Sequence, residues 1–188
     1  MNESLLGQLL IAMPGLQDPR FQKSVILICE YSKTVVMGLI LNKQIYNLTL
    51  GEILVQNKRE KLKNNFSKQK IYSGGPVHTK QGFILHSEEK KYKTTEKILN
   101  NVFLTTSVEI LEDFGLSKGP YFKKIFLGCA VWDYEQLHRE ILENSWLTIK
   151  ADKKIIFHNS SDQPFIWNSC MSMLGVKTEN LVSFSGKA

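Results

Sequence analysis

The chain has 188 residues, of which 43% are apolar and 22% are charged, and its formal net charge at pH 7 is +6. This length favours one hydrophobic core and argues against two full domains. No apolar run approaches the roughly 18 residues of a membrane-spanning helix, and the first residues lack the basic stretch of a secretory signal. We therefore expect one compact domain over residues 1–188, located in the cytoplasm and without membrane contact.

The positive charge is concentrated in one segment. From Lys58 to Lys70 the chain holds six basic residues and one acid, which leaves little net charge for the rest of the sequence. Such a run is typical of a solvated, mobile helix end and loop, and contact with a polyanion is the alternative. Arginine, which recognises phosphates and guanine bidentately, occurs only three times in the whole chain. Direct reading of DNA is therefore not expected.

Strands are predicted to dominate the first part of the chain. Three β-branched, apolar stretches have this character: residues 5–12, 24–31 and 34–42. The two residues between the last two stretches predict an antiparallel hairpin. A turn-rich link at 13–19 separates the first two. A helix is expected from about residue 48, because Thr49 and Glu52 have the spacing of a capping box.

Strands and helices alternate in the rest of the chain. Further strands are predicted at residues 71–73, 82–86, 102–105, 125–132, 146–150 and 155–158, the last two as a pair around a turn. The stretch 125–132 is almost wholly apolar, which indicates burial on both faces in the middle of a sheet. Helices are predicted to begin with the caps Thr106 and Asp133 and with Pro164. In the second of them Leu137, Ile141 and Leu142 are expected to face inward.

Several predicted strands adjoin one another without an intervening helix. A pure doubly wound sheet is therefore not expected, and the pattern favours a mixed sheet flanked by helices. Cys29, Cys129 and Cys170 are odd in number, far apart and set among apolar neighbours. That setting predicts reduced thiols in the core and not a disulfide framework.

Gly74, Gly75 and Pro76 follow a predicted strand, where a glycine-rich turn can cradle phosphate. A P-loop also needs a Lys-Ser/Thr pair and a helix start, and neither follows here. The glycines are therefore interpreted as the backbone of a sharp turn. A small pocket for an anion or a peptide is the alternative.

His86 ends a predicted strand and is followed by Ser87 and two glutamates, a combination that acid–base chemistry can use. No third member of such a site is evident, so a hydrogen-bonded structural histidine is favoured over a ligand-site role. The other histidines and the cysteines lack metal-ligand spacing, and no serine has a Gly-x-Ser-x-Gly setting. We predict no catalytic residue, no metal and no cofactor.

Trp132, Trp146 and Trp167 begin, end or line predicted buried elements. Their rings could stack on bases or nucleosides. Packing in the core is the favoured interpretation, because large aromatic side chains contribute most when they are buried.

The order of short motifs is more informative than any one of them. The motifs are LGQLLIAMP at 6–14, Asp18 with FQKSV at 21–25, GLILNK at 38–43, GGPV at 74–77, GFILH at 82–86, LTTS at 104–107, and Trp132 with QL at 136–137, EI at 140–141 and NSWL at 144–147. In this order the chain resembles the bacterial AlgH/YqgE family from about residue 5 to residue 188. It departs from the family pattern at Val131 and Asp133, where relatives usually carry glycine. A ligand role that relies on close backbone approach there is not expected.

The resemblance implies a single α/β domain with a mixed, bifurcated sheet in the bacterial cytoplasm. It implies neither an enzymatic activity nor a cofactor. The family is named in part for a role in regulating alginate synthesis, and some members carry a transcriptional-regulator label. This chain has no predicted helix-turn-helix pair, so direct DNA binding remains doubtful.

Some motif positions are polar, or are loop glycines and prolines, and have no obvious packing role. They form the candidate ligand or interaction site: Asp18, Asn42, Gly74, Gly75, Pro76, His86 and Gln136. Bracing of the sheet junction is the alternative role for these residues.

The leading hypothesis is a non-enzymatic regulatory or protein-interaction role with a protein partner of unknown identity. One alternative is a small-molecule- or nucleotide-binding protein, or a hydrolase, with its pocket at the Gly-Gly-Pro turn and His86. Another is a nucleic-acid-associated protein that uses the segment from Lys58 to Lys70.

Overall fold

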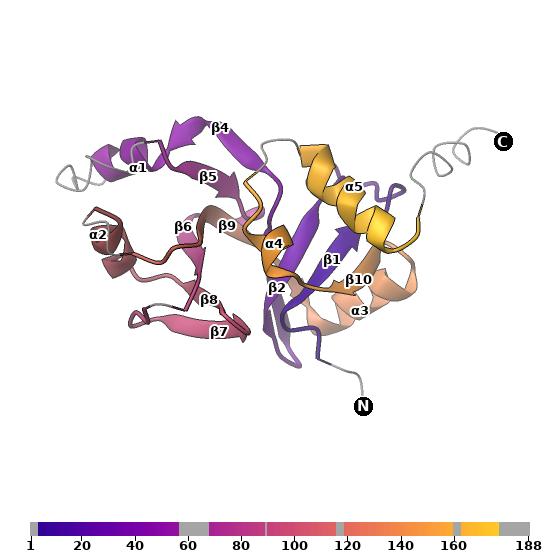
Figure 1. The fold of residues 1–188 in the computed structure, drawn as a ribbon. Coiled ribbons are helices and arrows are strands. Elements are labelled where there is room, and N and C mark those ends of the chain that lie inside the picture. Colours follow the sequence, from indigo (N-terminus) through magenta and orange to yellow (C-terminus); the bar gives the residue numbers. More distant parts are fainter. Residues whose placement is uncertain (1–3, 57–67, 89, 116–118, 160–162, 177–188) are drawn as a thin grey trace.

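The computed structural model describes residues 4–56, 68–88, 90–115, 119–159 and 163–176 (Figure 1). Its strands, in chain order, are β1 (Gln8–Ala12), β2 (Val25–Tyr31), β3 (Val35–Ile40), β4 (Gln44–Thr49), β5 (Lys70–Ser73), β6 (Val77–His86), β7 (Thr95–Leu99), β8 (Val102–Thr105), β9 (Lys123–Asp133) and β10 (Trp146–Lys150). Its helices are α1 (Leu50–Gln56), α2 (Glu109–Gly115), α3 (Tyr134–Leu142), α4 (Lys153–Ile156) and α5 (Gln163–Met173). Each of these helices is too short or too polar to span a bilayer.

The strands form one mixed sheet that forks at β9. Its main path runs β10-β1-β2-β3-β9-β6-β8-β7, and β4 with β5 forms a branch on β9. Along one side of β9, residues 125–127 pair in parallel with β5, and residues 130–133 pair antiparallel with β3. Strand β6 pairs antiparallel along the other side. The result is the predicted α+β mixture, a mixed and bifurcated sheet flanked by helices.

The helices cover the sheet in three separate packing clusters. Alternate residues of a strand point to opposite faces, and on β1 Leu10 packs under α3 whereas Leu9 packs under α4 and α5. The third cluster lies on the other arm of the fork, where α1 and α2 cover the branch strand β5 and its neighbours through Leu54, Ile110 and Phe114. Figure 1 shows this division, with α1 and α2 on one arm and α3 and α5 on the other.

Several predicted elements are confirmed. Strands β2 and β3 form the expected antiparallel hairpin, and β9 is the buried central strand. Helix α1 begins with a reciprocal capping box, in which the backbone N–H of Thr49 donates to Glu52 Oε2 at 2.7 Å and the backbone N–H of Glu52 donates to Thr49 Oγ1 at 3.4 Å. The three cysteines are buried and free. The three tryptophans are buried, as the core interpretation predicted.

The predicted pairing of residues 146–150 with 155–158 is wrong. Strand β10 instead pairs antiparallel with β1 along its whole length. Residues 153–156 form α4, because the Asp152 side chain accepts a hydrogen bond from the backbone N–H of Lys154 at 2.7 Å and so caps a helical turn. Strands β4 and β7 were not predicted. Both carry exposed polar residues and lack the long apolar run of a central strand.

Three local expectations also need correction. Helix α2 is capped by Ser107, whose Oγ accepts from the backbone N–H of Glu109 at 3.3 Å, and not by Thr106. Asp133 precedes α3 but makes no side-chain cap. Leu142 is 82% exposed and does not face the core, since α3 ends there and the chain turns away. Most of the predicted basic segment, residues 58–67, lies outside the described residues.

The Gly-Gly-Pro segment is a backbone crossing and not a hairpin turn, because β5 and β6 lie on opposite sides of β9. The N–H of Gly74 donates to Leu127 O at 2.8 Å, and its carbonyl accepts from the N–H of Ile40 at 2.9 Å. A Cβ on Gly74 would lie 2.2 Å from the carbonyl oxygen of Gly128, and one on Gly75 would lie 2.2 Å from the carbonyl carbon of Cys129. No side chain fits at this contact, so both positions require glycine.

We expect Gly74→Ala to lower the free energy of unfolding by at least about 2 kcal/mol, because the new methyl group must force two backbone segments apart. Gly82→Ala is the matched control, since a Cβ there meets nothing within 4 Å, and it should change stability by less than about 0.5 kcal/mol. Urea unfolding measures both values. Equal midpoints for the two variants would contradict the crossing.

Lys124 is a buried lysine on β9, with 1% of its surface exposed. Its Nζ donates to the carbonyl oxygen of His158 at 2.9 Å and lies 4.2 Å from the centroid of the Tyr72 ring. Burial lowers the pKa of Lys124 from its ordinary value of 10.5 to about 7, and the nearby charge of Lys70 adds to the effect. Between these two values the unfolded chain binds a proton that the folded chain does not, so stability rises with pH across this window.

Lys124→Met should remove this pH dependence. Relative to the variant, the wild-type free energy of unfolding should rise between pH 7 and 10, by up to about 1.4 kcal/mol per pH unit. Chemical unfolding at several pH values in this range measures the difference. Lys97→Met, at an exposed position on β7, is the control and should follow the wild type. Parallel curves for all three proteins would show that Lys124 keeps its ordinary pKa.

Candidate functional site: a cleft between the first loop and helix α3

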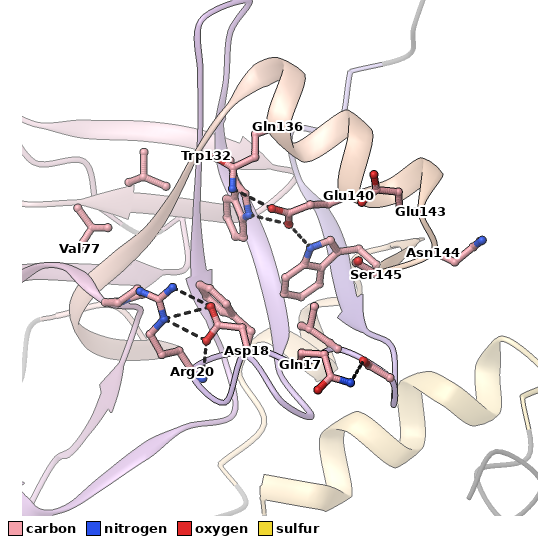
Figure 2. A pocket seen from close by; sticks show the side chains of 16 residues that line it. Gln17, Asp18, Arg20, Val77, Trp132, Gln136, Glu140, Glu143, Asn144 and Ser145 are labelled. Atoms are coloured by element: carbon pink, nitrogen blue, oxygen red, sulfur yellow. Dashed lines mark hydrogen bonds and ion pairs between the residues drawn. The ribbon is translucent and has the colours of Figure 1, made fainter. Parts of the chain in front are cut away.

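A cleft with a volume of about 560 Å³ lies on the arm that carries α3. Three parts of the chain form its walls: the loop between β1 and β2, the start of β6, and the continuous stretch from the end of β9 through α3 to β10 (Figure 2). The lining residues are Gly15, Leu16, Gln17, Asp18, Arg20, Phe21, Pro76, Val77, Val131, Trp132, Gln136, Glu140, Glu143, Asn144, Ser145 and Trp146.

The carboxylate of Glu140 joins α3 to two indole rings at the cleft wall. Its Oε2 accepts hydrogen bonds from Trp132 Nε1 at 3.2 Å and Trp146 Nε1 at 2.8 Å, and its Oε1 accepts from Gln136 Nε2 at 2.8 Å. Gln136 and Glu140 are four residues apart and so share one helix face. Figure 2 shows the carboxylate between the two indole N–H groups. Because both indoles are buried, this one carboxylate satisfies donors that would otherwise lack an acceptor.

Across the cleft, Asp18 and Arg20 form a bidentate ion pair (Figure 2). Arg20 Nη2 lies 2.7 Å from Asp18 Oδ2, and Arg20 Nε lies 3.0 Å from Asp18 Oδ1. The hydrogen bond from Arg20 holds the pKa of Asp18 below its usual value. The Arg20 side chain is 63% exposed, so the guanidinium faces solvent while it orients the carboxylate.

Phe21 connects this loop to the indoles. Its ring stacks on Trp132 with centroids 5.8 Å apart and meets Trp146 edge-on at 5.7 Å. The two indoles meet each other edge-on at 5.8 Å. These three rings fill the space beneath the cleft, and such contacts add to the stability gained from burial.

The cleft surface combines acids, amides and an apolar patch. Glu143 and Asn144 stand exposed at the end of α3, and Val131 is 36% exposed on β9. Val131 lies within strand β9 and not in a turn. Its side chain lines the cleft, at a position where relatives usually carry glycine. The lining carries three carboxylates and one guanidinium, and it is therefore locally acidic although the whole chain is basic.

Three of the predicted site residues meet at this cleft. Asp18, Pro76 and Gln136 all line it, although they are distant in the sequence. Gly74 and Gly75 form the crossing that leads into Pro76 and lie outside the lining. They brace the fork of the sheet.

Asn42 and His86 do not line the cleft, and both are buried among residues that suit a structural role. Asn42 is buried, its Oδ1 accepts from the N–H of Val25 at 3.0 Å, and its Nδ2 donates to Lys23 O at 2.8 Å. It closes the entry into β2. His86 is wholly buried and stacks on Phe103, and its Nδ1 lies 2.8 Å from Ser87 O. The Gly-Gly-Pro segment and His86 therefore do not form one pocket. Pro76 of that segment lines the cleft, and His86 does not.

Sequence reasoning did not select the residues that give this site its chemistry, namely Arg20, Glu140 and the two indoles. Gln136 and Glu140 are spaced by four on a predicted helix, which was an available signal. The indole contacts depend on how β9, α3 and β10 pack, and no local pattern reveals that arrangement.

The described residues offer binding chemistry and no metal site. They contain no cluster of His, Cys, Asp and Glu that could hold a metal ion. Burial raises the pKa of the thiols of Cys29, Cys129 and Cys170, which makes them poor nucleophiles. No histidine lines the cleft.

Comparison with known proteins identifies the family to which this fold belongs. The family model described as AlgH-like matches residues 9–179. The chain belongs to the AlgH-like family. A UPF0301 protein of Pseudoalteromonas translucida is 38% identical over 187 residues, covering 99% of this chain and 100% of the relative. A UPF0301 protein of Xanthomonas euvesicatoria is 38% identical over 184 residues, covering 98% of this chain and 96% of the relative.

Solved structures confirm the AlgH-like fold. The solution structure of the AlgH protein from Pseudomonas aeruginosa matches with a TM-score of 0.77 and 32% identity, covering 100% of both chains. The crystal structure of a Corynebacterium diphtheriae protein matches in fold, with a TM-score of 0.73, 20% identity, and coverage of 99% of this chain and 94% of that one. The resemblance inferred from motif order is thereby confirmed.

Glu140→Leu should lower the free energy of unfolding, because two buried indole N–H groups lose their acceptor, at about 1–3 kcal/mol for each unsatisfied group. Thermal and chemical unfolding measure the loss. The exposed neighbour Glu143 provides the control, and Glu143→Leu should stay within about 0.5 kcal/mol of the wild type. Similar stabilities for both variants would refute the bracing role of Glu140.

Proposed function

We propose that the protein acts in the bacterial cytoplasm as a non-enzymatic binding protein, and that the cleft between the first loop and α3 holds its ligand. One observation carries the proposal: Asp18, Pro76 and Gln136 come together with Arg20 and Glu140 around a single cleft. The volume of about 560 Å³ lies within the range of roughly 300–1,000 Å³ that small-molecule sites occupy.

The chemistry of the cleft favours binding over catalysis. Both oxygens of Glu140 already accept N–H donors, and Asp18 is held by Arg20, so these carboxylates are occupied and not poised to take a proton from a substrate. The groups that face the cleft are the exposed guanidinium of Arg20, amides at the rim and the apolar side chain of Val131. A small polar molecule with one apolar portion fits this combination.

A thermal-shift screen tests the proposal by measuring the melting temperature of the protein in the presence of cellular metabolites, including nucleotides. A true ligand at about 100 times its dissociation constant should add about 2.7 kcal/mol to the stability of the folded chain. Arg20→Gln and Gln136→Ala should abolish the shift, while each lowers the stability of the free protein by about 1 kcal/mol or less through the lost contact with Asp18 or Glu140. Lys97→Gln, on β7 away from the cleft, is the matched control and should retain it. A shift that survives both cleft variants, or turnover of the bound compound, would overturn the proposal.

A second candidate is a regulatory interaction with a partner protein that docks beside the cleft. It is favoured by Leu142, which is 82% exposed on α3 directly before the cleft residue Glu143. A photo-crosslinking amino acid placed at position 142 in living cells should capture one defined partner. The same probe at Tyr46, another exposed position, should not capture it. Identical patterns from the two positions would reject a specific surface.

A further inference from the structure

Exposed aromatic side chains gather around α4, away from the cleft lining. Tyr121 is 80% exposed, Phe165 is 50% exposed and Phe122 is 40% exposed. Ring contacts connect them in two groups: Tyr121 with Phe122 at 4.8 Å and Phe122 with Phe157 at 5.5 Å, then His158 with Phe165 at 5.0 Å. Phe157 and His158 are adjacent in the chain at the end of α4, so the two groups meet there. We call this set of five rings the aromatic row.

Lysines accompany the aromatic row. Lys153 Nζ lies 4.4 Å from the centroid of the Phe122 ring, and Lys154 follows it on α4 with an exposed side chain. Lys70 Nζ donates to Asn159 O at 3.2 Å, beside His158. The ammonium groups of these three lysines form no ion pair with a carboxylate in the described part of the chain.

Lys123 follows Phe122 in the chain but points away from this surface, because its Nζ lies 5.1 Å from the centroid of the Phe114 ring on α2. Its Nζ donates to Pro120 O at 3.1 Å. Among the described residues, the acids close by in the sequence are Asp152, which caps α4 through the Lys154 N–H, and Glu88, which follows the residue paired with Phe122. Glu89 and Asp162 lie outside the described residues. Lys70, Lys153 and Lys154 outnumber these two carboxylates, so the described part of the surface around α4 is net positive.

We propose that the aromatic row and its lysines bind single-stranded nucleic acid, with bases stacked on Tyr121 and Phe165 and phosphates held by the lysines. Exposed rings interleaved with cations are the combination that single strands require, because every base has a π-face and every nucleotide carries a phosphate. The positive surface complements a polyanion, and lysine suits phosphate contacts without reading bases. Duplex reading would need a recognition element in the major groove, and a four-residue α4 cannot supply it.

This inference is independent of the ligand proposed for the cleft, because the two sets of residues do not overlap. It also differs from the sequence hypothesis for the segment from Lys58 to Lys70, because it rests on the aromatic row and shares Lys70 with that segment.

Fluorescence anisotropy with labelled oligo(U) and oligo(dT) of about 12 nucleotides tests the inference on the full chain. Three lysine contacts predict that affinity falls about 20-fold between about 50 and 200 mM salt. Tyr121→Ala and Phe165→Ala should each weaken binding by about tenfold, the loss expected when one base no longer stacks. The double variant Lys153→Gln with Lys154→Gln should weaken binding and flatten its salt dependence.

Two control variants make the result specific. Lys97→Gln removes a positive charge from the exposed side of β7, and Leu142→Ala removes an exposed apolar side chain from α3. Both should bind as the wild type does. Circular dichroism establishes that each ring variant is folded, and Lys154→Gln alone leaves the contact of Lys153 with Phe122 in place and so provides a readout that does not disturb ring packing.

Four outcomes would overturn the proposal. These are no binding at low salt, unchanged affinity in both ring variants, equal losses in the control variants, and binding to phosphatidylglycerol vesicles in the absence of oligonucleotide binding. The last outcome would assign the surface to anionic lipid.

Discussion

The close backbone contact of Gly74 and Gly75 with Gly128 and Cys129 is the constraint on which the architecture depends. Strand β9 has to leave β5 and join β3 within a few residues, and the chain that links β5 to β6 has to pass over it at the same point. Side chains at the crossing would keep the backbones apart. Their absence lets one strand belong to both arms of the sheet and gives each arm its own face for helices to cover.

The same crossing positions the cleft. Pro76 follows Gly75 of the crossing and lies in the cleft wall. Trp132 is four residues after Gly128 on β9 and also lines the cleft. The indole of Trp132 then meets Glu140 on α3 and Phe21 from the first loop. A backbone contact that has no chemistry of its own therefore determines where the polar residues of the cleft come together.

The parts of the fold that local patterns encode could be predicted. The apolar stretch of β9, the capping box of Thr49 and Glu52, and the short hairpin link before β3 each carry their own signal. Strand β7 carries little, since its charged residues suit a loop as well as an edge strand. The pairing of β10 with β1, rather than with its sequence neighbour, and the contact of Glu140 with two indoles depend on distant segments. Single-sequence reasoning cannot supply such partners, and the family resemblance predicted the forked sheet but not the cleft.

The position of β9 also has a consequence for synthesis of the chain. Val36 of β3 pairs with Trp132, nearly a hundred residues later, so this edge of β3 stays open while the intervening residues are made. Long-range pairing of this kind slows folding, and an open apolar strand edge is a site for unwanted association. Residues 123–133 therefore join the two arms of the sheet late in synthesis, and the edge of β3 stays open to association in a nascent chain that ends before them.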